Sequence, residues 1–346
     1  MSGSSLDGLD ICYCSFTQKT NGWNHQILHA ETIPFTPAWR ETLKKAYQSK
    51  AIELAETDHR FGVWMGKKVL EFLNKHHIVK KIDLIASHGH TIFHAPQKGF
   101  TTQIGSGAAL AAVTNITTIS DFRSLDVAMG GQGAPLVPIG DEFLFPEYGY
   151  CLNLGGYGNI SFRYRGQRIA FDICPVNKAI NHLASWKNME LDRDGQMGRQ
   201  GKLLPSLLKK LNQLDFYQRQ GPKSLGDVWL KNHFLPIIDA HKTHPVQDLL
   251  RTVYQHIAEQ TAQATQHTQE STILSTGGGA YNKFLMECIQ HECHHSIILP
   301  DSMLIDFKEA LVFAFMGVLR YEHQVNCLAS VTGAKKDSTG GIIHFV

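Results

Sequence analysis

Apolar and polar positions divide the first part of the chain into short strands and longer helices. Residues 9–16 and 25–32 have the pattern of strands, and Asn21-Gly22 between them is a typical hairpin turn. Residues 51–75 repeat apolar side chains at helical spacing, and residues 82–87 form a short apolar strand that ends at His88. A helix over 108–114 and a strand over 117–120 follow, and residues 121–126 are expected to form a loop. This alternation is typical of α/β proteins.

A similar pattern starts again near Tyr148. It predicts strands over 150–154 and 159–164, then a strand over 271–275, a helix over 282–290 and a strand over 296–299. Both halves open with a glycine-rich turn and strands, which is a weak internal repeat. We therefore expect two similar α/β domains, residues 1–145 and 146–346, with a ligand cleft between them and a hinge near residues 145–148. The final helix and tail are candidates to return to the first domain.

Three glycine clusters stand at the turns of this pattern. They are Gly3-Ser4-Ser5-Leu6-Asp7-Gly8, Gly155-Gly156-Tyr157-Gly158 and Gly277-Gly278-Gly279. Glycine allows backbone N–H groups to approach an anion closely, so such turns can hold a polyphosphate. The third cluster joins a predicted strand to a predicted helix, whose amino terminus supplies further N–H donors. The clusters together predict a nucleotide site.

Composition narrows the class of protein. The chain has 346 residues with 33 basic and 31 acidic side chains, and this net charge of +2 gives no general attraction to nucleic acid or anionic membrane. We find neither a run of about 18 apolar residues nor the pattern of a signal peptide. Seven cysteines without a C-x-x-C pair fit a reducing compartment. We expect a cytoplasmic protein that binds neither nucleic acid nor membrane.

Nine segments, in order along nearly the whole chain, resemble the anhydro-N-acetylmuramic acid kinase family. They include Met1-Ser2-Gly3, His88-Gly89-His90-Thr91, Asp121-Phe122-Arg123 and Phe171-Asp172, and they cover residues 1–10, 88–91, 121–123, 130–138, 171–177, 222–226, 277–282, 309–310 and 331–334. The resemblance implies two duplicated actin-like (ribonuclease H-like) domains that close on ATP and Mg²⁺. It also implies a homodimer and a reaction of cell-wall recycling, in which water opens the 1,6-anhydro ring of an amino sugar and O6 is phosphorylated.

The resemblance assigns the nucleotide site and the catalytic base. Asp172 stands where the family carries its catalytic aspartate, and a carboxylate suits a base that takes a proton from water. A helix cap is the alternative role for it. Asp7 is a candidate Mg²⁺ ligand. The expected cofactor-binding residues are Gly3, Ser4, Ser5, Leu6, Asp7, Gly8, Leu9, Asp10, Gly155, Gly156, Gly277, Gly278, Gly279 and Asn282.

A second set of residues is expected to bind the sugar. Arg123 offers a two-pronged partner for the lactyl carboxylate, and Asp126 could accept hydrogen bonds from the sugar or from water. His88, Asn159, Asn177 and Glu309 complete the set. Two alternatives stay open: Arg123 and Asp126 could pair across a surface turn, and His88 could be a packed histidine.

One motif indicates a different chemistry. His291-Glu292-Cys293-His294-His295 matches H-E-x-x-H, which on one helix places two histidines for zinc and a glutamate as base. It falls at the end of the helix predicted over 282–290, so a histidine-rich helix end is the favoured interpretation.

Two departures from the family pattern affect the functional hypothesis. The family's Asp-Thr-Gly-Pro-Gly-Asn is replaced by Asp172-Ile173-Cys174-Pro175-Val176-Asn177, and a positive φ at Val176 would strain the loop. A catalytically silent homologue that senses nucleotide or sugar is therefore the alternative function, and another carbohydrate kinase of the same fold is a third. The family also has an apolar strand ahead of its Met-Ser-Gly segment. The sequence leaves open whether that strand is missing or the chain begins late.

Overall fold

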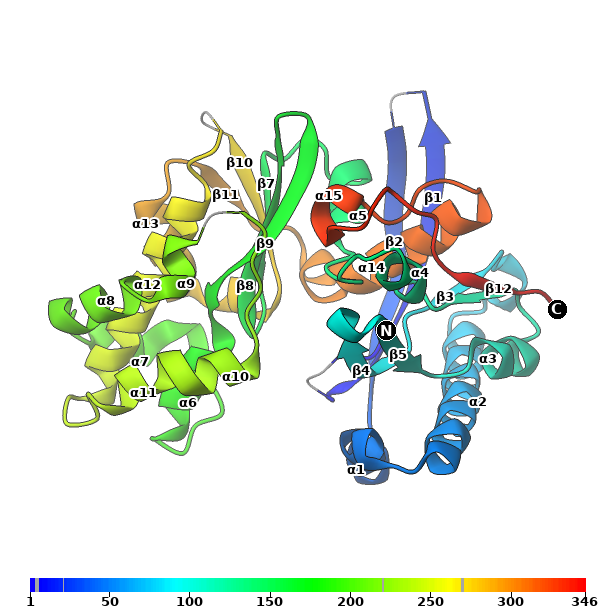
Figure 1. Ribbon diagram of the computed structural model, residues 1–346, viewed down its shortest axis with the longest axis horizontal. Coiled ribbons are helices and arrows are strands. Elements are labelled where there is room, and N and C mark those ends of the chain that lie inside the picture. Colours follow the sequence, from blue (N-terminus) through cyan, green and yellow to red (C-terminus); the bar gives the residue numbers. More distant parts are fainter. Residues whose placement is uncertain (4–5, 21, 220, 269–270) are drawn as a thin grey trace. The chain divides into compact units, whose positions relative to one another are not determined.

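The computed structural model describes residues 1–3, 6–20, 22–219, 221–268 and 271–346. It divides into two compact units, and each combines helices with strands, so the predicted α/β class is confirmed (Figure 1). Unit 1 comprises Met1–Leu144 and Phe307–Val346, and unit 2 comprises Phe145–Asp306. The chain passes from unit 2 back to unit 1 inside helix α14, Ser302–Tyr321.

Unit 1 contains three small sheets. β1 (Gly8–Lys19) and β2 (Gly22–Pro34) form an antiparallel hairpin, and β4 (His90–Ala95) pairs with β5 (Phe100–Ile104). The third sheet has the order β12-β6-β3, with β3 (Ile85–Ser87) parallel to β6 (Thr118–Ser120) and β12 (Ile342–His344) antiparallel to it. The helices are α1 (Pro37–Lys45), α2 (Ala51–Lys75), α3 (Gly107–Thr114), α4 (Ser124–Ala128), α5 (Pro138–Phe143) and α15 (Ala329–Thr332).

Helix α2 buries one face and packs closely on α3. Phe61, Met65 and Phe72 recur on its apolar face and are buried. Gly62 allows the start of α3 to lie close to α2, because a Cβ on Gly62 would lie 2.6 Å from the carbonyl oxygen of Ser106. The same helix begins with Glu53 accepting a hydrogen bond from the backbone N–H of Lys50.

Unit 2 is built on one five-stranded sheet with the order β11-β10-β7-β8-β9. β7 (Tyr150–Leu154) lies between β8 (Tyr157–Tyr164), which is antiparallel to it, and β10 (Thr272–Thr276), which is parallel. β9 (Gln167–Pro175) and β11 (Ser296–Ile298) form the edges. The helices are α6 (Asn177–Ser185), α7 (Gln196–Gln200), α8 (Pro205–Asn212), α9 (Asp215–Gln218), α10 (Asp227–Trp229), the π-helix Leu230–Phe234, α11 (Leu235–Asp239), α12 (Val246–Ala264) and α13 (Lys283–Glu292).

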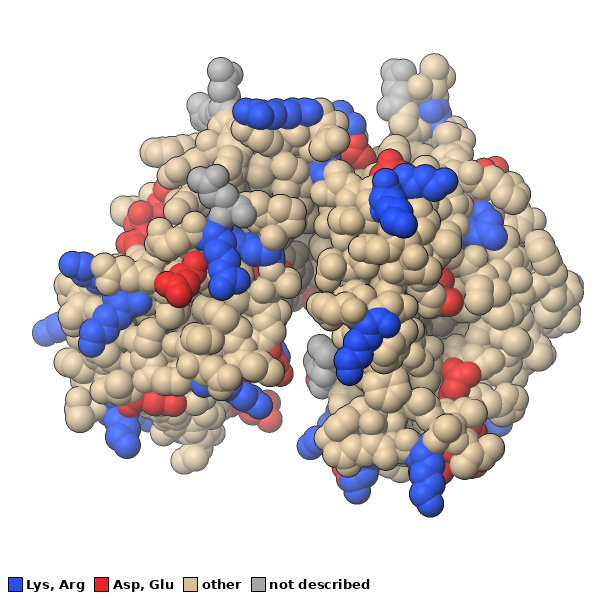
Figure 2. Space-filling model, viewed as in Figure 1, with Lys and Arg blue, Asp and Glu red and all other residues tan. Residues whose placement is uncertain are grey.

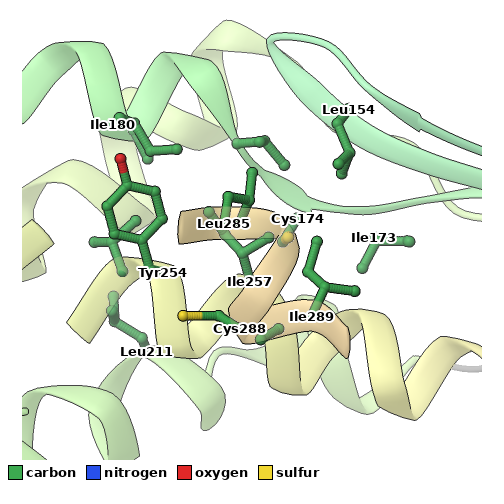
Figure 3. Close-up of a cluster of buried hydrophobic side chains, with 14 of the residues drawn as sticks. Leu154, Ile173, Cys174, Ile180, Leu211, Tyr254, Ile257, Leu285, Cys288 and Ile289 are labelled. Atoms are coloured by element: carbon green, nitrogen blue, oxygen red, sulfur yellow. The ribbon is translucent and has the colours of Figure 1, made fainter. Parts of the chain in front are cut away.

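A continuous apolar core lies between this sheet and its helices. Ile257 of α12 and Leu285 of α13 are fully buried in it, together with Ile173 and Cys174 from β9 (Figure 3). Burial of this kind stabilises a fold by about 25 cal/mol for each Å² of apolar surface removed from water. The core therefore fixes the strands whose ends carry the glycine turns.

Most predicted elements of the first half, and those around the second glycine cluster, are confirmed. The helix over 51–75 and the strand over 150–154 have the predicted bounds, and the hairpin is longer than predicted at both strands. Asn21 of the expected turn lies outside the described residues. The prediction of a loop over 121–126 is wrong in part, because α4 begins at Ser124.

The described part of the chain contains no helix long and apolar enough to cross a membrane. On the face shown in Figure 2, lysine and arginine side chains are interspersed with aspartate and glutamate, and neither sign forms a continuous field.

Candidate functional site

Two glycine turns of unit 2 lie at the same edge of its sheet. Gly155-Gly156 follows β7, and Gly277 follows β10, which pairs with β7 in parallel with Thr276 opposite Asn153. The carboxyl ends of neighbouring parallel strands meet at one edge, where α/β proteins bind their ligands. The second and third predicted clusters are thus brought together within one unit.

Asn177 joins the two turns. Its Nδ2 donates to the carbonyl of Leu154, and its backbone N–H donates to the carbonyl of Gly155 at 3.2 Å in both cases. A Cβ on Gly279 would lie 3.4 Å from its Oδ1 and one on Gly278 would lie 3.7 Å from its Nδ2. Asn177 therefore stands at the first helical position of α6 with both turns beside it.

The geometry of the turns fits a phosphate-binding backbone. Gly277 has φ +82°, and a Cβ there would lie 2.6 Å from Oδ1 of Asn153. Gly279 has no room for a side chain either, because its Cβ would lie 2.8 Å from the side chain of Leu154. Only glycine allows this close packing of one turn on the other, which leaves backbone rather than side chains at the strand ends.

Asn282 has a structural role in addition to the predicted one. Its side chain caps α13 by accepting from the N–H of Leu285 at 3.0 Å, and its Nδ2 donates to the Tyr254 hydroxyl at 2.9 Å. The same hydroxyl donates to the buried carboxylate of Asp192 at 3.0 Å. The cap and this network hold the start of α13 beside the glycine turn.

A row of polar side chains crosses the sheet of unit 2 and ends at Asp172. The register places Thr276 opposite Asn153, Asn153 opposite Asn159, and Asn159 opposite Asp172. Residues directly opposite one another share a face of the sheet. Asn153 was not among the predicted site residues, although a polar residue that interrupts an apolar strand just before a glycine turn is a signal that the sequence contains.

The environment of Asp172 changes its protonation. Its backbone N–H donates to the carbonyl of Lys223 at 2.9 Å, and its Oδ2 accepts from the N–H of Leu225 at 2.7 Å. Burial raises the pKa of Asp172 from 3.8 to about 6, and the Leu225 N–H lowers it by a smaller amount. Asp172 lies inside β9 rather than at a helix end, so the alternative role as a helix cap is wrong. A partly dehydrated carboxylate of this kind is suited to accept a proton near neutral pH.

Val176, one of the altered residues after Asp172, does not adopt a positive φ. Its φ is −117°, outside the left-handed region, so the strain expected from a positive φ does not arise. The side chains of Val176 and Cys174 are fully buried. Val176 packs against Gly158, because a Cβ added to Gly158 would lie 3.0 Å from Cγ2 of Val176. The replaced residues are thus part of the apolar core (Figure 3).

An exposed cluster lies beside the Asp172 loop. Lys178 forms an ion pair with Asp227, and the Tyr157 hydroxyl donates to the same carboxylate at 2.8 Å. The Lys178 ammonium lies 5.0 Å from the centre of the Tyr157 ring. None of these three was predicted, because they come from three separate segments with no common motif.

In unit 1, Arg123 and His88 follow the ends of the parallel strands β6 and β3. Nε of Arg123 donates to Nε2 of His88 at 2.9 Å, and its NH1 donates to the Gly133 carbonyl at 2.5 Å. Nδ1 of His88 then donates to the carbonyl of Gly89. Burial, and next the Arg123 charge, hold the pKa of His88 well below its usual value, so this imidazole is neutral. His88 therefore holds the guanidinium in a fixed plane.

Glu309 lies close to the same guanidinium. Burial raises the pKa of Glu309, and the nearby charge of Arg123 opposes that rise. Burial in turn lowers the pKa of Arg123 to about 10, while Glu309 acts in the opposite direction. Two predicted sugar-binding residues of opposite charge thus lie within electrostatic range of one another in unit 1, with Arg123 half-buried and the Glu309 side chain exposed.

Asp126 has structural contacts that the sequence did not predict. Its carboxylate is 1% exposed and accepts from the Gly133 N–H at 2.7 Å and from the Thr332 hydroxyl at 2.7 Å. The alternative of a surface pair between Arg123 and Asp126 is therefore wrong. Asp126 instead ties the glycine loop of residues 130–133 to α15.

The first glycine cluster is described except for Ser4 and Ser5, which lie outside the described residues. Gly8 packs against β2, where a Cβ would lie 2.5 Å from the Ile33 carbonyl oxygen, and Leu9 is buried. Oδ1 of Asp10 accepts from the Thr32 hydroxyl at 2.6 Å. The carbonyl of Gly3 accepts from the N–H of Leu6 at 3.3 Å, and Leu6 has φ +57°.

The structure describes no group of three histidine, cysteine, aspartate or glutamate side chains that could hold a metal ion. Mg²⁺ that accompanies a nucleotide keeps several waters and needs only one or two carboxylates. The exposed side chain of Asp7 fits that limited role.

The histidines of the H-E-x-x-H motif do not share a helix. α13 ends at Glu292, and Cys293 is its C-cap. His295 is buried, accepts at Nδ1 from the Ser271 N–H, and donates from Nε2 to the Thr265 carbonyl at 2.7 Å. Both ring nitrogens of His295 form hydrogen bonds within the protein. The favoured interpretation of the motif as a histidine-rich helix end is therefore confirmed.

Known proteins resemble this chain over its whole length. Residues 1–346 match the family profile described as "Anhydro-N-acetylmuramic acid kinase". Proteins of that name are 34% identical in Actinobacillus pleuropneumoniae serotype 7 (strain AP76), over 378 residues, and 33% identical in Aliivibrio fischeri (strain ATCC 700601 / ES114), over 363 residues. Each alignment covers 99% of this chain and 97% of the relative.

Solved structures give weaker similarities. An activator of 2-hydroxyisocaproyl-CoA dehydratase from Clostridium difficile, with bound ADPNP, has a TM-score of 0.40 and 12% identity, covering 90% of this chain and 98% of that one. A ROK family glucokinase from Streptomyces griseus, in complex with glucose and AMPPNP, has a TM-score of 0.38 and 9% identity, covering 88% and 98%. The sequence matches alone decide the relationship, and the chain belongs to the anhydro-N-acetylmuramic acid kinase family.

Proposed function

We propose that this protein is an ATP-dependent kinase of 1,6-anhydro-N-acetylmuramic acid. It opens the 1,6-anhydro ring with water and phosphorylates O6, giving N-acetylmuramic acid 6-phosphate. The observation that carries this proposal is the family match over residues 1–346, with identity of 34% to a kinase of that name. The raised pKa of Asp172 supports it, because it is the property that a general base needs.

The bonds of the proposed reaction balance around one proton transfer. Water attacks the anomeric carbon and gives its proton to the Asp172 carboxylate, while the bond from that carbon to O6 breaks. The released O6 receives the terminal phosphoryl group of ATP, and ADP leaves. The hydrogen bond from Leu225 holds Oδ2 of this base in place, and Asn159 lies opposite Asp172 in the sheet.

The other residues of the site bind and orient. We infer that the turns at Gly155 and Gly277 hold phosphate oxygens with backbone N–H groups, and that Asp7 approaches the Mg²⁺ carried by the nucleotide, which neutralises phosphate charge. Arg123, fixed by His88, is the proposed partner of the lactyl carboxylate. Asn177 and Glu309 are proposed sugar ligands.

Incubation of the purified protein with ATP, Mg²⁺ and the anhydro-sugar tests the proposal. Mass spectrometry should detect the 6-phosphate, and in ¹⁸O-labelled water the product should carry one ¹⁸O at the anomeric carbon. Sugar binding without any phosphosugar would instead support the silent sensor. Release of ADP only with other sugars of a substrate panel would support the third hypothesis.

We also propose that the protein acts as a cytoplasmic homodimer, independent of nucleic acid and membrane. The family relationship and the mixed surface charges of Figure 2 support this. Light scattering coupled to size-exclusion chromatography tests the dimer, since a mass near 38.7 kDa rather than twice that value would contradict it.

A further inference from the structure

The side chain of Lys178 covers the glycine turn between β7 and β8. A Cβ added to Gly156 would lie 3.2 Å from both Cγ and Cε of Lys178. The backbone N–H of Lys178 also donates to the Gly156 carbonyl at 3.3 Å. The ammonium is one bond beyond Cε, so a group bound at this turn lies within its reach. Lys178 directly follows Asn177, which joins the two glycine turns.

Two side chains hold this ammonium beside the turn. Lys178 forms an ion pair with Asp227, and its Nζ lies 5.0 Å from the centre of the Tyr157 ring. The Tyr157 hydroxyl donates to the same carboxylate at 2.8 Å. The side chain of Lys178 is 39% exposed and that of Asp227 is 58% exposed, so the cluster faces solvent. Ion pairs of such exposure are weak, and an exchange of partners costs little.

The same cluster lies next to Asp172. Tyr157 is the first residue of β8 after the turn, and Asp227 comes two residues after Leu225, whose N–H binds the Asp172 carboxylate. Burial raises the pKa of the Tyr157 hydroxyl, and the bond to Asp227 and the charges of Asp227 and Asp172 add to that rise. This neutral hydroxyl is therefore within electrostatic range of both carboxylates. Lys178 thus places a positive charge near the glycine turn and near the proposed base.

A phosphoryl group is a stronger partner for this ammonium than one carboxylate. Phosphoryl transfer depends on positive charge placed around the transferred group, whose oxygens share more negative charge than Asp227 carries. A lysine ammonium has three rotatable donors on a flexible stem, so it can turn from one partner to another. The bonds from Lys178 and then from Tyr157 lower the pKa of Asp227, so this carboxylate stays charged and holds the ammonium until a phosphate replaces it.

We propose that Lys178 is a phosphate-binding residue, which exchanges Asp227 for the terminal phosphate of a nucleotide bound at Gly155-Gly156. This inference rests on the proposed kinase function and deepens it, since it names the side chain that recognises the terminal phosphate. Asp227 and Tyr157 act as positioning residues that keep the ammonium at the turn. Only the partner of the ion pair changes, without a covalent step.

Nucleotide binding measured without sugar tests this inference apart from the kinase reaction. Calorimetric titrations use a non-hydrolysable ATP analogue and ADP, which lacks the terminal phosphate. Lys178→Met should weaken binding of the analogue by about tenfold or more and leave that of ADP within about twofold. Lys187→Met, an exposed lysine just beyond the carboxyl end of α6, is the matched control and should change neither. Unchanged binding of the analogue, an equal loss for both nucleotides, or a parent that binds neither would overturn the inference.

Two further variants separate phosphate binding from a structural role of the ion pair. Lys178→Arg keeps the charge and should bind the analogue within about threefold of the parent. Asp227→Asn removes the competing carboxylate, so it should bind the analogue at least as tightly as the parent does. If Lys178 served only to hold Asp227, then Asp227→Asn would weaken binding as much as Lys178→Met does, and that result would overturn the inference. Thermal unfolding checks that each variant is folded.

The sugar reaction gives a separate result. If the binding differences appear but no phosphosugar forms, the phosphate role of Lys178 stands and the proposed kinase activity fails. If phosphosugar forms and Lys178→Met changes neither its kcat nor the binding of the analogue, the kinase activity stands and this inference is wrong.

Discussion

The backbone N–H of Leu225 donates a 2.7 Å hydrogen bond to Oδ2 of Asp172. A hydrogen bond to a carboxylate lowers its pKa, yet burial has the larger effect and raises the pKa of Asp172 to about 6. The segment of residues 222–226 thus orients the carboxylate without removing its basicity. This balance has a direct consequence for the pH dependence of the reaction.

We expect kcat/KM for the anhydro-sugar to rise about tenfold per pH unit below pH 6 and to level off above it. The base must be deprotonated, and its pKa in the folded protein is about 6. Initial rates between pH 4.5 and 8.5, with stability checked at each pH, measure the profile. A rate that is constant from pH 5 to pH 8 would mean that another group is the base.

Asp172→Asn should abolish turnover, with a loss of at least about a hundredfold, while nucleotide binding stays within about twofold of the parent. The amide keeps an oxygen that can accept from Leu225 but cannot take a proton. Rates and calorimetric titration with a nucleotide measure the two effects. Asp239→Asn, an exposed carboxylate of unit 2 beside His182, is the matched control and should keep full activity.

Asp172→Asn should not lose stability at neutral pH. A carboxyl whose pKa is raised from 3.8 to about 6 destabilises the folded state increasingly as pH rises through that interval. Asparagine removes this penalty but weakens the bond to Leu225, so we expect the free energy of unfolding at pH 8 to rise by about 0–2 kcal/mol. A clear fall in a denaturant titration would show that the charged form stabilises the fold.

Gly277→Ala should destabilise unit 2 by about 2 kcal/mol or more. Its φ is +82°, and the added Cβ would meet Oδ1 of Asn153 at 2.6 Å. Gly278→Ala is the matched control, because its nearest neighbour would be 3.7 Å away. Thermal unfolding of both variants checks the difference, and equal Tm values would mean that the turn can relax without cost.

The sequence predicted those parts of the site that depend on one local pattern. Gly155, Gly277 and Asn177 each lie in a recognisable segment, and the structure brings them together at one sheet edge. Whether the loop at Val176 has a positive φ could not be predicted from the sequence. In the structure its φ is −117°, and its side chain packs against Gly158, which is distant in the sequence. The role of Asp126 was also hidden, since its partner Thr332 is 206 residues away.

The helices of unit 2 illustrate the same limit. α12 has a periodic apolar face but was not predicted, and neither was β9, although it contains Asp172. The turn at Arg165-Gly166 precedes β9, but the apolar residues of β9 lie among polar ones, so the pairing with β8 determines the strand. Tertiary contacts here decide what local propensity leaves open.

Arg123→Lys should raise KM for the anhydro-sugar by about tenfold or more and leave KM for ATP within about twofold. The lysine keeps the charge but cannot donate in one plane to His88, to the Gly133 carbonyl and to a carboxylate. Arg60→Lys, an exposed arginine of α2 paired with Glu56, is the control and should leave both constants unchanged.

A second substrate, 1,6-anhydro-N-acetylglucosamine, lacks the lactyl carboxylate and distinguishes a sugar-binding role of Arg123 from a purely structural one. If Arg123 binds that carboxylate, the parent should prefer the lactyl sugar strongly and Arg123→Lys should lose most of the preference. An equal loss of activity toward both sugars would show instead that Arg123 acts by holding the loop of Gly133.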